Sequence, residues 1–433
     1  MKVRRALMIL GIIAITLSGV NLLNTTKVKL TFSESYPAVV CPPTDAHVTS
    51  QVSVASRSTP YRRIIGKSVN LSPIKTVLYS NNKDAILLDQ GAVSSIAWQG
   101  LPGIWAGSTL CRAPQGDQWF VGGTGDVTSK GRLYLVNSGL SDAIVDVAVW
   151  SESGAKSGNV LTVSANSSMR VPLDLLAAGA SRLVIRVTPR SGRVNAFLID
   201  ERSKGLETLG GDPVNSVDFP RTDVVISGIP QQVVKGVGGP HLLRILVPGN
   251  VDANIRVDSI SKDGVFVPVG LDGRVVPHGQ VVDIKLSSTI AYSAFSLRIR
   301  SDQPLVAGVY TPLRVKSHRD IVWNSASPEL VPMTMALTGF APALIFTGDT
   351  VDLVVTTRLV SGRFKAAHVT GSDAVIWRVP DKAQSITISA IKAPVVGSGL
   401  ISSPSGAGAF PLSIGSNLTR AVVPVSDIAV INR

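Results

Sequence analysis

Apolar and polar residues alternate in short runs along most of this chain. In the run from Ala143 to Trp150, Val145, Val147 and Val149 fall on one face of an extended strand, and the residues between them fall on the other. A period of two with one apolar face is typical of a half-buried β-strand. Residues 183–187 repeat the pattern, and no long helical period follows the N-terminal segment. We therefore expect an all-β protein.

The stretch from residue 119 to residue 197 recurs along the chain. Its predicted parts are an opening at 119–123, strands at 132–137 and 143–150, and late strands at 182–187 and 194–198. A second copy follows in the same order at 243–247, 253–257, 297–300 and 306–309. A weaker third copy follows Ala341. Units of about 100 residues with frequent turns have the size and rhythm of an immunoglobulin-like sandwich.

These patterns predict tandem immunoglobulin-like β-sandwich domains behind a single N-terminal transmembrane or signal helix. The predicted segments are 1–26 as a cytoplasmic n-region and signal-anchor helix, 27–111 as an N-terminal β-rich segment that packs on the first repeat, and 112–205, 222–315 and 320–433 as three β-sandwich repeats. Within the last segment, residues 398–410 are rich in glycine, serine and proline and predict a loop, whereas residues 421–425 predict a final strand. The one helical pattern, from Pro172 to Ala178, predicts a turn or two.

The N-terminus has the pattern of a targeting segment. Lys2, Arg4 and Arg5 precede an uncharged run from Ala6 to Leu23. A helix of that length spans about 27 Å, close to the hydrocarbon thickness of a bilayer. We expect an uncleaved single-pass anchor with a cytoplasmic N-terminus, so that the chain from Lys27 onward is extracytoplasmic at the cell membrane. The alternative is a cleaved signal, which would make the protein secreted.

The two cysteines, Cys41 and Cys111, agree with that location. Paired cysteines usually form a bridge in an oxidising compartment. A bridge that closes a loop of this length contributes about 4 kcal/mol in the chain-entropy model. Two unpaired buried thiols are the alternative. We expect no metal site, because no histidine lies at ligand spacing from either cysteine.

The chain is basic, with a formal net charge of +13. Such a surface favours anionic neighbours such as lipid headgroups or acidic wall polymers. The charge is diffuse, and Lys and Arg form no block of five or more. This pattern argues against nucleic acid as a partner.

Two sets of side chains are candidates for binding. The first set is a possible basic stripe of outward strand residues, which consists of Arg182, Arg186, Arg256, Arg298 and Arg300. Such arginines could bind a phosphate-rich or carboxylated wall polymer, or they could simply keep the sheet surfaces soluble. The second candidate is Trp150, which by alternation lies on the face opposite the three valines. It is a possible aromatic contact, exposed for ring stacking or buried against a neighbouring unit.

Motifs of catalysis are missing from the sequence. It contains no Gly-x-Ser-x-Gly elbow, no phosphate-binding loop that opens a helix, and no pair of histidines at metal-ligand spacing. We therefore assign no catalytic, cofactor-binding or metal residue, and we expect a protein that is not an enzyme.

Several motifs together resemble a known family. They are the Trp119-Phe120-x-Gly122-Gly123 opening, the Leu133-x-Leu135-x-Asn137 strand, the Asp320-Ile321-Val322-Trp323 linker and the Cys41-Pro42-Pro43 segment. In their order they resemble the domain-of-unknown-function family 5719, a β-repeat of actinobacterial exported proteins. The resemblance implies an extracytoplasmic envelope protein without an assigned activity, and it carries no catalytic residue to this chain.

The sequence therefore favours a membrane-anchored structural or interaction protein of the cell envelope, whose partner is an envelope protein or an anionic wall polymer. A binding module for anionic cell-wall polysaccharide is the alternative function. An uncharacterised envelope hydrolase is a second alternative, which the missing motifs disfavour.

Overall fold

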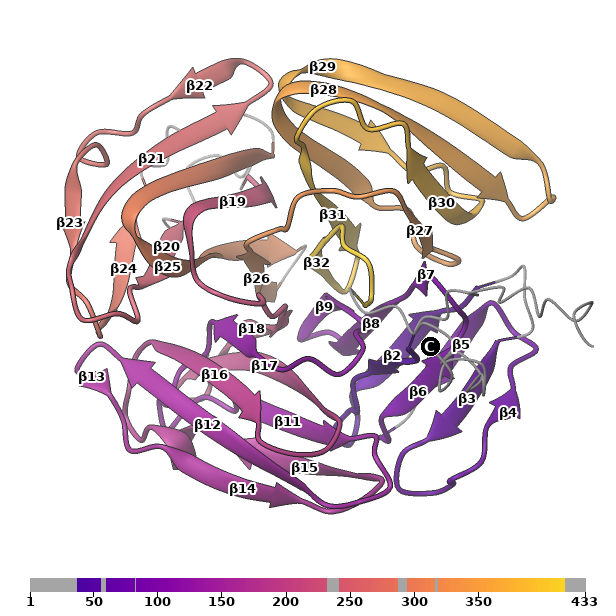
Figure 1. Cartoon of the computed structure of the whole chain (residues 1–433), viewed down its shortest axis with the longest axis horizontal. Helices are drawn as coiled ribbons and strands as arrows, with labels where there is room; N and C mark the ends of the chain where they lie inside the picture. The colour runs from indigo at the N-terminus through magenta and orange to yellow at the C-terminus, as the bar shows by residue number, and fades with distance from the viewer. Residues whose placement is uncertain are drawn as a thin grey trace, which may run out of the picture. The chain divides into compact units, whose positions relative to one another are not determined.

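The structure is a computed structural model that describes residues 37–55, 60–81, 83–231, 241–286, 294–315 and 318–416. All of these residues belong to one compact unit. Strands dominate it (Figure 1), which confirms the predicted all-β class. The predicted turn of helix is present as α2 (Leu173–Leu176).

Two predictions fall on other parts of the chain. The expected membrane segment from Ala6 to Leu23 and the expected final strand at 421–425 lie outside the described residues. Among the helices that are described, none has the length and apolar character needed to span a membrane.

The N-terminal part of the described chain forms a two-sheet unit, sandwich 1. One sheet has the order β1 (Val39–Cys41), β6 (Ile86–Asp89), β3 (Tyr61–Ile64) and β4 (Ser72–Pro73), and the other has the order β5 (Leu78–Asn81), β2 (Thr49–Ser53), β8 (Ile96–Leu101) and β9 (Trp105–Leu110). Apolar side chains such as Val52 and Leu88 fill the space between the sheets. Cys41 and Cys111 lie in the same core and form a disulfide. The predicted bridge is confirmed, and the alternative of free thiols is excluded.

Sandwich 2 contains the first predicted repeat. Its outer sheet has the order β10 (Gln118–Val121), β16 (Leu183–Pro189), β12 (Ala143–Ser151) and β13 (Gly154–Ala155), and β14 (Asn159–Val163) also pairs with β12. Its inner sheet has the order β15 (Ser167–Pro172), β11 (Arg132–Asn137), β17 (Val194–Lys204) and β18 (Glu207–Val214). As predicted, Val145, Val147 and Val149 are buried in the core. The alternation of side chains therefore located this core face correctly.

Sandwich 3 repeats the arrangement, but the long strand β25 (Phe295–Val315) takes the place of β16 and β17 and belongs to both layers. One layer also contains β19 (Arg221–Ile229), β21 (Ala253–Ser261), β22 (Gly264–Phe266) and β23 (Arg274–Val276). The other layer also contains β20 (Leu242–Leu246), β24 (Val281–Lys285) and β26 (His318–Ser325). β12 begins at Ala143 and β21 begins at Ala253. The two strands start 110 residues apart, and the strand predicted at 253–257 in the second copy is therefore confirmed.

Sandwich 4 is built around β28 (Ala343–Leu359), which contributes to both layers. Its other strands are β32 (Gly406–Pro411), β31 (Val396–Ser403), β29 (Phe364–Arg378), β30 (Ala383–Ser389), β27 (Met333–Ala336) and β7 (Val93–Ser94) from the N-terminal part of the chain. β7 pairs in parallel with β27. Sandwich 4 therefore receives a strand from the segment that forms sandwich 1.

The predicted loop at 398–410 is wrong, because β31 and β32 form a hairpin there. Its glycines are required by crowding. A Cβ at Gly406 would lie 2.5 Å from the backbone nitrogen of Ala106, and a Cβ at Gly399 would lie 2.6 Å from Cε1 of Phe410. Such distances are too short for any larger side chain. The composition that usually marks a loop therefore marks close contact between strands here.

The two-sheet character predicted for this repeat is confirmed. The successive strands β16 and β17 lie in different sheets, and β17 pairs with β18 within the inner sheet.

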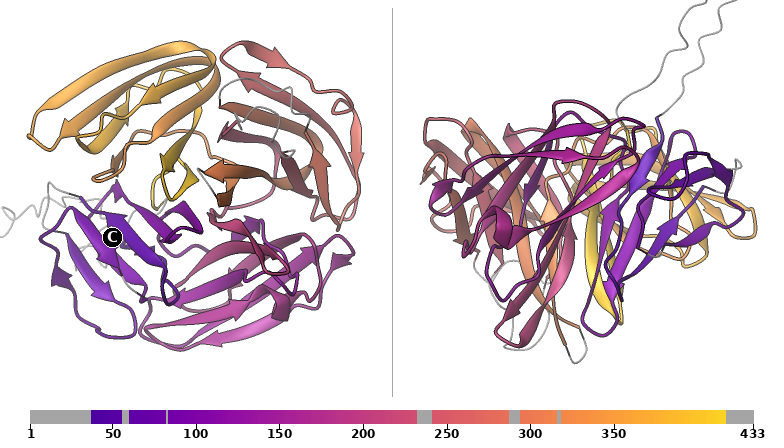
Figure 2. Two further views of the ribbon diagram at one scale, coloured as in Figure 1. Left: turned by 180° about the vertical axis from the view of Figure 1, so that it is seen from behind. Right: turned by 90° about the horizontal axis from the view of Figure 1, so that it is seen from below.

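The four sandwiches lie around a common centre (Figure 1), and the view from behind shows the same four groups (Figure 2). Each contributes its innermost strand, which is β9, β18, β26 or β32 in chain order. β9 contacts β18, β18 contacts β26, β26 contacts β32, and β32 contacts β9. The predicted linker at Asp320–Trp323 is wrong, because these residues lie within β26. The arrangement is therefore radial rather than end to end.

Candidate functional site

One carboxylate links the four innermost strands. Oδ1 of Asp320 accepts hydrogen bonds from the backbone N–H groups of Gly211, at 3.2 Å, and Ile321, at 2.9 Å. Oδ2 accepts from the N–H of Ala106 at 3.4 Å, and the N–H of Ala407 also donates to this carboxyl group. Burial raises the pKa of Asp320 to about 7, although these donors act in the opposite direction.

Trp323 lies three residues further along β26 and connects two more buried carboxylates. Its backbone N–H donates to Oδ2 of Asp212 at 2.7 Å. Its indole N–H donates to Oδ2 of Asp200, also at 2.7 Å. Burial raises the pKa of Asp212 well above its usual value. Both aspartates come from sandwich 2, so this tryptophan fastens sandwich 3 to sandwich 2.

Two arginines complete the cluster. Arg244 donates to both carboxylate oxygens of Asp283, at 2.8 and 3.0 Å, and to the carbonyl of Gly123 at 2.7 Å. Its guanidinium lies 5.0 Å from the Trp323 ring centroid. Burial alone would raise the pKa of Asp283, but the neighbouring Arg244 holds that pKa below its usual value. Arg202 pairs with Asp200 at 2.8 Å.

We call this cluster the hub, and it consists of Asp200, Arg202, Asp212, Arg244, Asp283, Asp320 and Trp323. Each of its charged side chains has at least one oppositely charged, aromatic or backbone partner, although Oδ1 of Asp200, Oδ1 of Asp212 and one terminal nitrogen of Arg202 have no hydrogen-bond partner among the described residues. None of its members lines the pocket described below. The hub therefore joins the sandwiches through buried contacts and is separate from the pocket.

A pocket of about 470 Å³ lies where sandwiches 2, 3 and 4 meet. Sandwich 2 contributes the segment 216–219 that follows β18. Sandwich 3 contributes the first half of β19, part of β25 and the segment 326–329 that follows β26. Sandwich 4 contributes the bulge of β28 at 347–350 and the residues 393–396 at the start of β31. Leu305, Val306 and Val395 make part of the lining apolar. A cavity of this size is typical of small-ligand sites.

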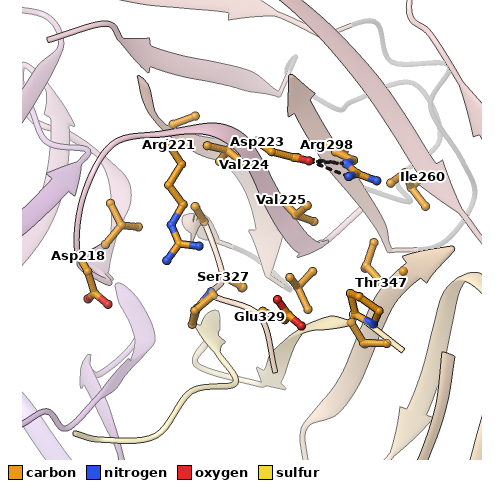
Figure 3. Close-up of a pocket in the computed structure, with 18 of the residues that line it drawn as sticks. Asp218, Arg221, Asp223, Val224, Val225, Ile260, Arg298, Ser327, Glu329 and Thr347 are labelled. Atoms are coloured by element: carbon orange, nitrogen blue, oxygen red, sulfur yellow. Dashed lines mark hydrogen bonds and ion pairs between the residues drawn. The ribbon is translucent and has the colours of Figure 1, made fainter. Parts of the chain in front are cut away.

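Charged side chains of both signs surround the pocket (Figure 3). Arg298 pairs with Asp223 at 2.7 Å and with Asp349 at 3.8 Å, and Arg112 pairs with Asp218 at 2.9 Å. Two charged side chains of the lining take part in none of these pairs.

The two remaining charges are those of Arg221 and Glu329. Arg221 lies over the ring of Phe219, 4.4 Å from its centroid. Within the described residues, neither Arg221 nor Glu329 forms an ion pair, and Figure 3 shows both side chains directed into the pocket. They are the charged groups with which a bound molecule could pair.

The edge of β19 is open along the pocket. β19 pairs with β25 on one side only. On its other side, the N–H of Ser327 donates to the carbonyl of Val225, and the Asn324 amide donates to the carbonyls of Ser227 and Gly228. The part of the edge that precedes Val225 has no such cover among the described residues.

The predicted basic stripe does not form a continuous surface. Arg256 and Arg300 share Asp258 in sandwich 3, where Arg298 pairs with Asp223. Each of these three side chains therefore faces a carboxylate, and of the five predicted arginines only Arg298 lines the pocket.

The other two predicted arginines lie in sandwich 2. Arg186 pairs with Asp117 at 2.8 Å and lies 5.1 Å from the Trp119 ring centroid. Arg182 donates to the hydroxyl of Ser181 at 3.4 Å, and its charge acts on the hub carboxylate Asp283. The stripe is thus divided between two sandwiches and largely neutralised.

Trp150 is partly buried against a neighbouring unit, which corresponds to one of its two predicted placements. Its ring stacks on Trp119 with centroids 5.3 Å apart and planes at 21°. The pair packs with Val281 and Val306 of sandwich 3. Trp150 therefore contributes to the contact between sandwiches 2 and 3.

Sequence reasoning missed the hub and the pocket. The hub left a signal, because Asp200 follows Leu198 and Ile199, and Asp320 precedes Ile321 and Val322. A carboxylate inside an apolar strand requires buried partners. Arg221 and Glu329 left no comparable signal, because they are distinguished only by forming no ion pair among the residues that the structure describes.

The comparison with protein families gives one result. The family model described as Family of unknown function (DUF5719) matches residues 88–358, which is more than half of the chain. The match includes the Trp119 opening and the Asp320–Trp323 segment, and it begins after Cys41. No curated protein matches the chain.

Proposed function

The chain belongs to the family of unknown function DUF5719, and from that premise we propose that it is a membrane-anchored, extracytoplasmic interaction protein of the cell envelope that catalyses no reaction. The family description assigns no activity, so support for this role comes from the chain's own residues. The proposal has two parts, a location and a kind of activity.

The disulfide between Cys41 and Cys111 is the observation that carries the location. Both cysteines are fully buried, and stable structural disulfides are typical of proteins that fold outside the reducing cytosol. The charged n-region and the apolar run from Ala6 to Leu23 support attachment to the membrane.

The hub and the pocket support an interaction role. The hub joins the four sandwiches through buried contacts, which favours a rigid platform. The pocket is open and carries two charges, those of Arg221 and Glu329, that form no ion pair within the described part of the chain. The alternative, a module for anionic polysaccharide, has less support, because Arg186, Arg256, Arg298 and Arg300 already face aspartates.

Cell fractionation with a thiol trap tests the location. The full-length chain and a variant without residues 2–26 are expressed in the same bacterial host. We expect the full-length chain to sediment with membranes, to be cleaved by protease added outside the cytoplasmic membrane, and to contain oxidised cysteines. The shortened chain should remain in the cytosol with reduced thiols. A full-length chain found in the cytosol with free thiols would contradict the proposal.

A further inference from the structure

We propose that the pocket binds an extended peptide segment of a partner protein, which adds a strand to the open edge of β19 and pairs its carboxylate with Arg221 and its cationic group with Glu329. This inference rests on the proposed interaction role and names the chemistry of the partner. Strand addition is a common mode of peptide recognition, in which main-chain hydrogen bonds supply affinity and side-chain pockets supply specificity.

The register of the sheet shows which main-chain groups are available. Ile299 of β25 lies between Val257 of β21 and Val224 of β19. The N–H of Val257 donates to the carbonyl of Leu271, so it points away from β25 and Val257 is not hydrogen-bonded to Ile299. The main-chain N–H and C=O of Ile299 therefore point to the other side and hydrogen-bond Val224 of β19. The N–H and C=O groups of the two neighbours, Asp223 and Val225, point to the opposite edge. The bond from Ser327 to the Val225 carbonyl agrees with this direction.

Three main-chain groups consequently face the pocket without a backbone partner in the described chain. They are the N–H and C=O of Asp223 and the N–H of Val225. Together they offer two donors and one acceptor in the spacing of a strand. From Arg221 to Val225 the edge is about 13 Å long, at about 3.3 Å per residue. This length and the 470 Å³ pocket suit a short extended segment.

The charges favour a peptide over an acidic polymer. Arg221 can receive one carboxylate, but Asp223, Glu329 and Asp349 also line the pocket. A polymer with a carboxylate on every unit would place some of them next to these acidic side chains. A peptide with one acidic and one basic group matches Arg221 and Glu329, whose charges are unpaired within the described chain. The partly exposed apolar side chain of Val225 in the pocket then contacts one of its alternate side chains.

Peptide binding and hydrogen exchange test the proposal on the full-length chain. The probes are fluorescent pentapeptides of the form Lys-X-Thr-X-Glu, in which X is Val, Leu, Tyr or Phe. We expect at least one to bind and to slow the exchange of the Asp223 and Val225 amides at least tenfold. The amide of Val224, which already bonds to β25, should change little. The same peptide with N-methylated amides should not bind, because it cannot pair with a strand.

Charge reversal identifies the site. Arg221→Glu should lower the affinity at least tenfold, and the double variant Arg221→Glu/Glu329→Lys should recover affinity for the peptide with its two charges exchanged. The matched control is Arg274→Glu, which alters an exposed arginine on β23 outside the pocket and should leave affinity unchanged.

The proposal is overturned if no peptide of the set binds, or if N-methylation leaves binding intact. It is also overturned if oligogalacturonate binds at Arg221 and the peptides do not, which would make the pocket a polysaccharide site. These failures are distinguishable from failure of the proposed function. An extracytoplasmic chain that binds no peptide refutes only this inference, whereas a cytosolic chain that binds peptide refutes only the location.

Discussion

The hub and the pocket both lie where sandwiches meet, but they differ in whether their charged side chains have partners. In the hub, Asp320 accepts hydrogen bonds from backbone groups on four strands, and Arg244 is held by Asp283, a carbonyl and an aromatic ring. In the pocket, Arg221 and Glu329 lack oppositely charged partners among the described residues. Buried charges require such partners, whereas exposed charges do not. We therefore assign hub charges to folding and pocket charges to binding.

The largest expected effect comes from removing a hub charge. Arg244→Met leaves Asp283 largely buried without its partner and should lower the free energy of unfolding by about 3–5 kcal/mol. Guanidinium chloride unfolding of the full-length chain measures this change. The double variant Arg244→Met/Asp283→Leu should recover part of the loss, because it no longer leaves a lone charge. If Arg244→Met alone were as stable as the parent, the assignment of the hub charges to folding would be wrong.

A smaller effect is expected from pH. The pKa of Asp320 is about 7 in the folded chain and near 4 when unfolded, so the folded state holds the proton more tightly. Its contribution to stability is complete below about pH 4 and is lost as pH rises through 7. Between pH 5 and pH 8, the free energy of unfolding should fall by about 2–3 kcal/mol.

Asp320→Asn is the matched variant for this titration. It should show a shallower dependence on pH, although not a flat one, because burial raises the pKa of Asp212 in the same direction. Unfolding curves at several pH values, compared with those of the parent, measure the difference. Identical slopes for the two proteins would show that Asp320 does not titrate in this range.

Exposed ion pairs should contribute less than the hub. Arg256 pairs with Asp258, and the Arg256 side chain is 48% exposed. The Asp258 carboxylate also pairs with Arg300, so the loss of Arg256 does not leave it without a partner. Arg256→Gln should therefore lower the free energy of unfolding much less than Arg244→Met does, measured by the same denaturation. A loss as large as that of Arg244→Met would show that the former stripe is structural.

The smallest change in stability is expected in the pocket. Arg221→Gln removes a charge that pairs with no described carboxylate, so the free energy of unfolding should stay within about 0.5 kcal/mol of the parent. Thermal and chemical unfolding both check this. A loss of about 2 kcal/mol or more would place Arg221 with the hub, not with binding.

Local features of the fold could be predicted from the sequence, but its closure could not. The strands β12 and β21 follow from a period of two, which is a local property, and their spacing follows from the recurrence of that pattern. The radial arrangement depends on contacts between strands up to 300 residues apart, such as β9 and β32. The hairpin at 396–411 was not predicted, because its glycines indicated a loop, whereas close contact between strands is what requires them. The carboxylates that face the arginines depend on strand register, which one sequence does not reveal.

Hydrogen exchange of the unliganded full-length chain tests the central contrast most directly. The amides of Ala106, Gly211 and Ile321 bond to Asp320, and we predict that they exchange only through global unfolding. The amides of Asp223 and Val225 at the open edge should exchange at nearly the rate of an unfolded chain. Hub amides that exchange through local opening, or edge amides as protected as those of the hub, would contradict the account.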